Sequence, residues 1–416
     1  MKILLLPSYF IPEGVSSPYI SKNRNQAFAD KGWDMVVYTP IPCRGISKEL
    51  RKEYKSKKFE IMLDGRMTVH RFNLVSEKKN PIIRAFRYFA QNIIQFNRGV
   101  FFKDARSCDV MLIASTPPTQ GAMAALIKKC TGKPLIYNLQ DIFPDSMIST
   151  GLAKKDGLLW KIGRIIENFT YRNADKIIVI SEDFKKNIMA KGVPEDKIEV
   201  IYNWVDQSVV YPVDSNDNYL FEELGISKEK FRIVYAGNLG NAQNISIILD
   251  AAAIMARVEN MEFLIFGSGG NEDEIRERIA KEKLTNVRLL PLQPYENVKF
   301  VYSMGDACVV SCKAGLGGSA MPSKTWSILS CGRPVIASFD EGELKMILEK
   351  HECGVFTKAD DTNAFVEGIM KLYNDRELCK EYGKNGRKFI LENLTKEVGT
   401  QKYVDVIKSV VKEKTL

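Results

Sequence analysis

Histidine is nearly absent from this chain of 416 residues, which contains only His70 and His351. We therefore expect neither a histidine-based metal site nor a Ser-His-Asp triad. The eight cysteines lack the paired spacing of a metal site, because Cys308 and Cys312 form the only close pair, and we interpret all eight as reduced thiols. No Asp-x-Asp motif follows a predicted strand, so the sequence predicts no bound metal and no other cofactor.

Long apolar runs are also missing from the sequence. None reaches the roughly 18 residues needed to span a bilayer, and the apolar start at Lys2–Pro7 is too short for a secretory signal. We therefore expect the chain to stay in the cytoplasm. The first predicted strand is followed by PSYFIPEG (residues 7–14) instead of G-x-G-x-x-G, which argues against a hydride-transfer enzyme.

Basic residues are concentrated in the first half of the chain. Residues 1–200 contain 33 Lys and Arg against 20 Asp and Glu, whereas residues 201–416 contain 27 against 31. Such an excess favours an anionic partner. Nucleic acid is one candidate, but no helix-turn-helix, zinc-finger, ribonucleoprotein or KH signature accompanies the charge. We therefore expect no nucleic acid and predict an anionic membrane surface as the partner.

The stretch 78–106 combines this charge with aromatic residues. It holds seven basic residues against one acidic residue, and apolar residues between Ile82 and Phe101 recur at the i, i+3, i+4 spacing of one helix face. Arg84, Arg87 and Arg98 lie off that face and are the candidate membrane contacts. Two interpretations remain open, namely a helix lying in the membrane interface and a core helix with a solvated basic back.

Strand and helix patterns alternate along almost the whole chain. Apolar runs that precede helical stretches form two series: Ile3–Leu6, Met35–Tyr38, Val110–Ala114, Leu135–Leu139 and Ile177–Ile180, then Ile233–Ala236, Phe263–Phe266, Val287–Leu290, Cys308–Val310 and Pro334–Ala337. Each series predicts a parallel sheet covered on both faces, so the fold class is α/β with two Rossmann-like units. The polar segment 203–230 is the predicted linker between them, and Lys48–Lys58 is the predicted surface insertion.

The segment Lys313–Ala337 (KAGLGGSAMPSKTWSILSCGRPVIA) has the composition of an anion site. Its small residues at 315–319 let backbone amides approach a ligand, Ser323 is the predicted cap of helix 323–331, and Lys324 adds a cation. An ordinary loop, cap and helix is the alternative. Two glycine turns, GNLG at 237–240 and GSGG at 267–270, also follow strands of the second unit, where α/β proteins bind ligands. We infer a nucleoside diphosphate site there.

These segments occur in an order that resembles glycosyltransferase family 4. The order runs from FxPE through NLQDIFPDSM, ADKIIVIS, NWVD, VYAGNLGNAQN, FGSGG, LLPLQPYENV, GDACVV and PSKTWSILSCGRPVIA to a closing helix, and it covers nearly the whole chain. It is most similar to the bacterial branch that builds exopolysaccharide, O-antigen and colanic-acid-type glycans. The resemblance implies two facing Rossmann-like domains of the glycosyltransferase-B (GT-B) fold. We expect an acceptor domain at 1–204, a donor domain at 205–394 and a C-terminal helix within 395–416 that crosses back to the first domain.

The resemblance also implies a reaction. It is a retaining, metal-independent transfer of a hexosyl, N-acetylhexosaminyl or deoxysugar group from a nucleoside diphosphate sugar, UDP before GDP, to a lipid-linked saccharide at the inner face of the cell membrane. Lys324 is the predicted catalytic cation for the leaving diphosphate, and Gln140 and Asp141 are predicted to orient the acceptor. The predicted donor-binding residues are Glu13, Gly14, Asn238, Gly240, Gly267, Leu292, Gly318, Ser319, Ser323 and Ser327.

The chain departs from the wider family at several of these positions. Ser319 and Ser327 match positions where most members carry two glutamates, and Asn238 and Gln243 match positions where an Arg and a Lys commonly bind the diphosphate. We expect Lys324 to replace the missing cations. A nucleotide-sugar epimerase of the same fold and a non-catalytic subunit of a glycan assembly remain alternatives, which donor-dependent product formation separates from a transferase.

Overall fold

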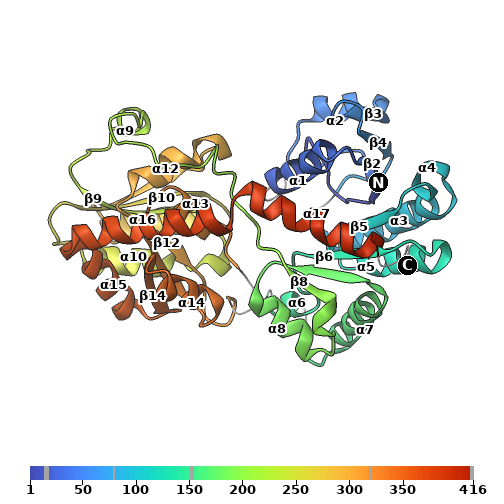
Figure 1. Cartoon of the computed structure of the whole chain (residues 1–416). Coiled ribbons are helices and arrows are strands. Elements are labelled where there is room, and N and C mark those ends of the chain that lie inside the picture. Colours follow the sequence, from blue (N-terminus) through green and yellow to red (C-terminus); the bar gives the residue numbers. More distant parts are fainter. Residues whose placement is uncertain (14–17, 78–79, 150–153, 318–320, 413–416) are drawn as a thin grey trace. The chain divides into compact units, whose positions relative to one another are not determined.

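The computed structural model describes residues 1–13, 18–77, 80–149, 154–317 and 321–412. It divides the chain into two compact units (Figure 1). Unit 1 comprises Met1–Tyr202 together with Glu397–Leu416, and unit 2 comprises Asn203–Lys396. Each unit has its own sheet and its own hydrophobic core. The predicted α/β class is therefore confirmed.

The sheet of unit 1 has the strand order β3-β4-β2-β1-β5-β6-β7-β8 among the described residues. All neighbouring strands pair in parallel except β3 and β4, which are antiparallel. The strands are β1 (Lys2–Leu5), β2 (Asp34–Pro40), β3 (Phe59–Met62), β4 (Met67–Phe72), β5 (Val110–Ala114), β6 (Leu135–Leu139), β7 (Lys176–Val179) and β8 (Ile198–Val200). Strand β6 is buried along its whole length and β5 up to its last residue, as expected for a parallel sheet covered on both faces.

Helices flank this sheet and the C-terminal helix joins them. They are α1 (Pro18–Asp30), α2 (Lys48–Ser56), α3 (Pro81–Phe101), α4 (Lys103–Arg106), α5 (Gln120–Thr131), α6 (Asp145–Ser149), α7 (Leu158–Asn173), α8 (Glu182–Ala190) and α17 (Lys396–Lys412). Figure 1 shows α17 in red beside the blue and green elements of unit 1. It is fixed there by the Tyr403 hydroxyl, which donates to Asn138 Oδ1 at 3.0 Å, and by Arg24, whose guanidinium lies 5.7 Å from the Tyr403 ring centroid.

Unit 2 contains a parallel sheet with the order β11-β10-β9-β12-β13-β14 in its described part. Its strands are β9 (Phe231–Asn238), β10 (Met261–Ser268), β11 (Val287–Pro291), β12 (Ala307–Ser311), β13 (Val335–Phe339) and β14 (Gly354–Lys358). Its helices are α9 (Leu220–Glu223), α10 (Ser246–Ile254), α11 (Glu272–Lys281), α12 (Val298–Met304), α13 (Lys324–Ser330), α14 (Glu343–Lys350), α15 (Thr362–Asn374) and α16 (Arg376–Asn393).

The apolar runs predicted as strands all coincide with strands of the structure. The strands without a prediction, β3, β4, β8 and β14, are short or half-exposed, so they lack a continuous apolar run. The Lys48–Lys58 segment is largely helix α2, which has no buried residue. Its surface position therefore agrees with the prediction.

Candidate active site

The candidate site in unit 2 lies at the carboxyl end of β9. Tyr235 and Gly237 lie in the last four residues of this strand, and Lys324 begins helix α13. The Lys324 ammonium donates to the Tyr235 hydroxyl at 3.0 Å and lies 4.1 Å from the centroid of the same ring. The Tyr235 hydroxyl in turn donates to the Asn238 carbonyl at 2.7 Å. One aromatic side chain therefore holds both the cation and the backbone of the turn.

Glycine is required where Lys324 meets this turn. A Cβ atom on Gly237 would lie 2.9 Å from Lys324 Nζ, and the φ of Gly237 is 149°. On the neighbouring strand, a Cβ on Gly267 would lie 2.5 Å from the Gly237 carbonyl oxygen. The β9 and β10 turns are thus packed backbone to backbone beside Lys324.

Burial lowers the pKa of Lys324 from 10.5 to about 8. Desolvation disfavours the charged amine, and the lysine has no carboxylate ion pair among the residues that the structure describes. Burial also raises the pKa of Tyr235, which keeps its hydroxyl protonated. A buried ammonium without a counter-ion is stabilised by a bound anion, so this position suits a phosphate group.

Other predicted donor residues surround the glycine turns or lie apart from them. Asn238 is exposed and donates to Gln243 Oε1 at 3.2 Å, with Gly240 packed against both side chains. Leu292 is exposed just after β11, and Ser327 is buried in α13. Gly14, Gly318 and Ser319 lie outside the described residues.

Two details of the Lys313–Ala337 segment differ from prediction. Ser323 was expected to cap the helix, but it has helical angles and makes no side-chain capping bond, and the helix is Lys324–Ser330. The amides of Gly315 and Gly317, expected to face a ligand, donate instead to Asp340 at 3.0 and 2.8 Å. The carboxylate of Asp340 is therefore the acceptor for the Gly315 and Gly317 amides, a pairing that sequence spacing did not reveal.

A separate candidate site in unit 1 follows β6. Gln140 donates from its backbone to Ser115 Oγ at 3.0 Å and from its side chain to Asn138 Oδ1 at 2.8 Å. The carboxylate of Asp141 is exposed in this loop. Desolvation raises its pKa, against a hydrogen bond from Ser146. Asp141 is thus available to a ligand, while Gln140 supports the loop.

Glu13 does not fit its predicted contact with the donor. Its carboxylate is buried, and it accepts backbone hydrogen bonds from Phe10 at 3.1 Å, Cys43 at 2.7 Å and Arg44 at 3.0 Å. These bonds join the loop after β1 to the loop after β2. Glu13 is therefore a structural residue, because both of its carboxylate oxygens accept hydrogen bonds from the protein.

Helix α3 has its polar side inward. The side chains of Arg87, Gln91 and Gln95 are buried, and Gln91 donates to Ser8 while Gln95 donates to the Tyr38 carbonyl. The outward face carries exposed apolar side chains, namely Ile82, Phe86, Phe89 and Ile93. The core-helix interpretation is therefore wrong for this face, since its apolar residues face outward.

The three arginines of α3 have different environments. Arg87 is 1% exposed and donates to the Val75 carbonyl, so its predicted membrane contact is wrong. Arg84 is exposed and lies 3.5 Å from Glu77. Arg98 is half-buried, with its guanidinium 4.2 Å from the Phe102 ring centroid.

A groove of about 680 Å³ runs between α3 and α5 and is lined almost entirely by apolar side chains, including Phe89, Met123 and Leu126. It reaches Phe143, which follows the Gln140–Asp141 loop by two residues. Helix α7 lies next to this end, because a Cβ on Gly163 would lie 3.0 Å from Phe143. This helix also exposes apolar side chains, namely Leu158, Leu159, Ile162 and Ile165. Sequence analysis did not single out α7, although its apolar residues show the same helical spacing.

The described residues show neither a metal cluster nor a membrane-spanning helix. No group of three or more His, Cys, Asp or Glu side chains is arranged to hold a metal ion. No helix in these ranges is long and apolar enough to cross a membrane.

Comparison with known proteins assigns both halves of the chain. Residues 25–209 match the model described as Glycosyltransferase Family 4, and residues 216–389 match Glycosyl transferases group 1. The "Probable glycosyltransferase WbjE" of Pseudomonas aeruginosa is 23% identical over 74% of this chain and 76% of its own length. WcaI of Escherichia coli (strain K12), a protein assigned to colanic acid biosynthesis as a glycosyl transferase, is 26% identical over 68% of this chain and 70% of its own. Among solved structures, Alr3699/HepE of Anabaena in complex with UDP superposes with a TM-score of 0.74 at 16% identity, covering 98% of this chain and 100% of that one.

Proposed function

Because this chain belongs to the family 4 glycosyltransferases of the GT-B type, we propose that it transfers a sugar from a nucleoside diphosphate donor to a lipid-linked saccharide acceptor. Surface polysaccharide synthesis is the proposed context, since WcaI is assigned to colanic acid biosynthesis. UDP is the preferred nucleotide of the proposal and GDP the alternative. UDP is also the ligand named for HepE.

Lys324 carries the donor half of this proposal. Its buried ammonium has no carboxylate ion pair in the described ranges, and it lies at the carboxyl end of β9 beside two glycine turns. A diphosphate bound there would restore the full charge of the lysine and receive a charge-assisted hydrogen bond. The same bond would stabilise the negative charge that develops on the leaving phosphate as the glycosidic bond breaks. Fixed donors of this kind can serve a metal-independent transfer.

The acceptor half rests on Asp141. Its exposed carboxylate follows β6, and its raised pKa makes it a better proton acceptor than an ordinary aspartate. We assign it to hydrogen bonding with the acceptor hydroxyl, and Gln140 to holding the loop. In a retaining transfer the hydroxyl attacks the face that the phosphate leaves, so a phosphate oxygen can take the proton.

The lipid-linked acceptor requires a membrane surface, and α3 with α7 supplies one. Both helices expose apolar side chains, those of α3 line the groove, and α3 carries no acidic residue. The one acidic residue of α7, Glu167, is buried and paired with Lys191 at 3.0 Å. The proposed occupant is an anionic lipid leaflet, because exposed apolar side chains and the excess of basic over acidic residues in residues 1–200 together favour such a surface.

Two measurements test the proposed function. Calorimetric titration with a panel of nucleoside diphosphates should show binding that Lys324→Ala weakens by about 10- to 100-fold, the usual range for a charge-assisted hydrogen bond. Mass spectrometry should then show donor-dependent elongation of a lipid-linked saccharide. Interconversion of the donor sugar without transfer would indicate an epimerase, and binding without any product would indicate a non-catalytic subunit.

A further inference from the structure

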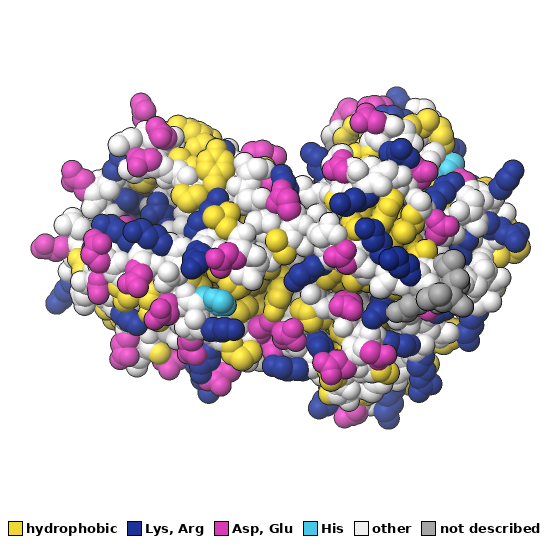
Figure 2. Space-filling view, viewed as in Figure 1, with side chains coloured by type: hydrophobic (Ala, Val, Ile, Leu, Met, Phe, Trp, Pro, Cys, Tyr) yellow, Lys and Arg dark blue, Asp and Glu magenta, His cyan; other side chains and the backbone are white. Residues whose placement is uncertain are grey.

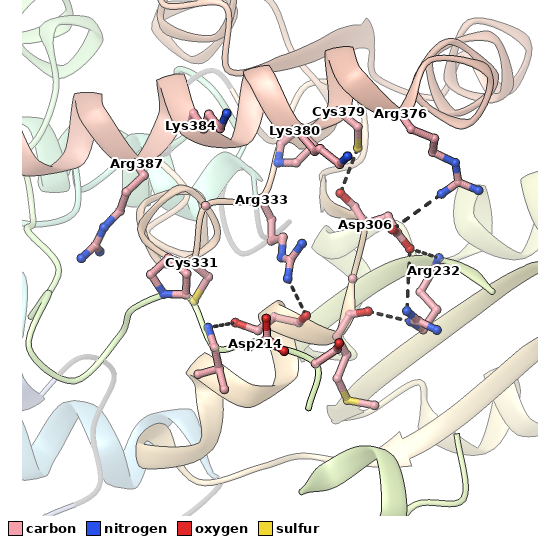
Figure 3. A pocket seen from close by; sticks show the side chains of 18 of the residues that line it. Asp214, Arg232, Asp306, Cys331, Arg333, Arg376, Cys379, Lys380, Lys384 and Arg387 are labelled. Carbon is pink, nitrogen blue, oxygen red and sulfur yellow. Dashed lines mark hydrogen bonds and ion pairs between the residues drawn. The ribbon is translucent and has the colours of Figure 1, made fainter. Parts of the chain in front are cut away.

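A large pocket in unit 2 lies at the amino ends of the strands, whereas Lys324 lies at their carboxyl ends. Its volume is about 1190 Å³, and it is lined by the starts of β9, β12 and β13 and by one side of α16 (Figure 3). Arg232 is the second residue of β9, Asp306 directly precedes β12, and Arg333 stands two residues before β13. Lys324 and Gly237 lie at the carboxyl ends of the strands. From Arg232 to Gly237 the strand advances five residues of ~3.3 Å each, which is about 16 Å. The hollow is therefore separate from the candidate donor site.

This hollow is strongly basic although its half of the chain is acidic. Residues 201–416 contain 27 basic and 31 acidic residues. The acidic residues that line the hollow are Asp214, Asp306 and Glu392, and the basic ones are Lys228, Arg232, Arg333, Arg376, Lys380, Lys384, Arg387 and Lys388. On the face shown in Figure 2, dark blue side chains gather over unit 2 near α16. The excess is thus local and does not follow from composition.

Helix α16 supplies five of these eight cations, and four of the five form one row. Arg376, Lys380, Lys384 and Arg387 follow each other at spacings of four, four and three residues, which places them on one face of the helix. All four side chains come from α16 in Figure 3. With a rise of 1.5 Å per residue the row is about 16 Å long, so it presents several cations to one elongated ligand.

Acidic residues pair with some of these cations and not with others. Asp306 accepts from the Arg232 amide at 2.7 Å and lies 3.6 Å from Arg376, while Lys380 pairs with Glu377 at 2.7 Å and Lys388 with Glu392 at 4.0 Å. No ion pair of Lys384 is found in the described part of the chain. Arg333 donates from Nη2 to the Ser303 carbonyl at 2.8 Å, and its buried Nε has no acceptor there. Arg387 uses only Nη1, which donates to the Ser330 carbonyl at 2.7 Å.

The cations also affect one another. Burial lowers the pKa of Arg232; the charges of Asp306 and Glu262 oppose this shift, and those of Arg333 and Arg376 add to it. Mutual repulsion of this kind decreases when an anion binds between the cations. Guanidinium and ammonium groups are the usual partners of phosphate oxygens, and several of them in a row select a ligand with several phosphates.

We propose that this basic pocket, lined by α16 and the starts of β9, β12 and β13, binds a small anion that carries several phosphate groups. This inference does not depend on the glycosyl transfer, because the pocket shares no residue with the candidate donor site.

Calorimetric titration with inorganic tripolyphosphate at about 0.15 M salt tests the proposal. The test variant is Lys380→Gln, Lys384→Gln and Lys388→Gln together, three exposed positions of α16 where Gln and Lys have similar helix propensity. We expect its dissociation constant to rise about tenfold or more, which corresponds to about 1.4 kcal/mol. The wild-type constant should also increase with salt, because the contacts are electrostatic.

Two controls make the result specific. Lys48→Gln, Lys52→Gln and Lys55→Gln remove the same charge from the exposed helix α2 and should leave tripolyphosphate affinity unchanged. Lys324→Ala should also retain tripolyphosphate binding at the pocket while weakening nucleotide binding. The proposal is overturned if wild type does not bind tripolyphosphate, or if the α16 variant binds it as tightly as the α2 control. Loss of binding in Lys324→Ala alone would assign the anion to the donor site and would also contradict the proposal.

Discussion

The buried charge of Lys324 should lower the stability of the fold, and the same charge should bind the donor. Lys324→Met separates the effect on stability from the effect on donor binding. The pKa of this lysine is about 8 in the folded chain against 10.5 for an ordinary lysine. Below pH 8 the amine is protonated in both states, so the folded state carries the full cost of holding a buried cation. Between pH 8 and 10.5 only the unfolded state stays protonated, and the cost disappears as the pH rises through this window.

The magnitude follows from the size of the pKa difference. A displacement of about 2.5 units at about 1.36 kcal/mol each gives at most about 3 kcal/mol, and partial exposure of the side chain reduces it. Methionine has a similar length and no charge, and the Tyr235 hydroxyl keeps its bond to the Asn238 carbonyl. Lys324→Met should therefore raise the Tm of unit 2 by several degrees at pH 7, since 1 kcal/mol corresponds to about 2–4 °C for a domain of this size.

The assay is thermal unfolding at pH 7, 8, 9 and 10, followed by nucleotide titration of the same samples. The Tm difference between Lys324→Met and wild type should shrink steadily towards pH 10, while nucleotide affinity is lost at every pH. Lys281→Met, an exposed lysine at the end of α11, is the matched control and should change neither quantity. A Tm difference that is zero at pH 7, or one that does not vary with pH, would refute the argument that Lys324 is a desolvated cation.

Three further predictions address the mechanism, a structural carboxylate and the membrane surface. In calorimetry, the nucleotide affinity of wild type should weaken about tenfold from pH 7 to pH 9 as Lys324 loses its proton, and an affinity independent of pH would contradict this. Turnover should survive EDTA, and activity that only Mg²⁺ or Mn²⁺ restores would contradict the metal-independent transfer. Glu13→Gln should lower the free energy of unfolding by about 1–3 kcal/mol, because the backbone amides of Phe10, Cys43 and Arg44 lose a charged acceptor. Its nucleotide affinity should equal that of wild type. A selective loss of nucleotide binding in the folded variant would indicate that Glu13 contacts the donor. Leu158→Ser with Leu159→Ser should reduce co-sedimentation with anionic liposomes, whereas Ile254→Ser, an equally exposed position in unit 2, should not; equal sedimentation of both variants would exclude α7 from the membrane surface.

The membrane prediction changed once the structure placed the three arginines of α3. Replacing Arg87 by Glu would put an unpaired charge in the interior, because Arg87 is buried against the Val75 carbonyl, and the result would report on folding instead of lipid binding. Arg84 and the exposed apolar residues of α7 are the informative positions. Sequence periodicity identified the two faces of α3 correctly but could not tell which of them faces the core.

The sequence by itself determined the properties that depend on neighbouring residues along the chain. Continuous apolar runs such as Val110–Ala114 and Leu135–Leu139 require strands buried on both faces, and the two series of such runs require two parallel sheets. The ordered motifs identified the family, which the matched models confirm. The position of Lys324 after a glycine-rich loop was also visible in the sequence.

Only the tertiary structure decided which groups satisfy one another across large separations in the chain. Tyr235 lies 89 residues from Lys324 and yet accepts a hydrogen bond from its ammonium. Asp340 accepts hydrogen bonds from the amides of Gly315 and Gly317, and Glu13 accepts one from the Cys43 amide, 30 residues away. The basic pocket is likewise assembled from strand starts and a helix that no local pattern connects. The physical reason is that hydrogen bonds and charges act over a few ångströms in space, whereas sequence periodicity reports only which side of an element is apolar.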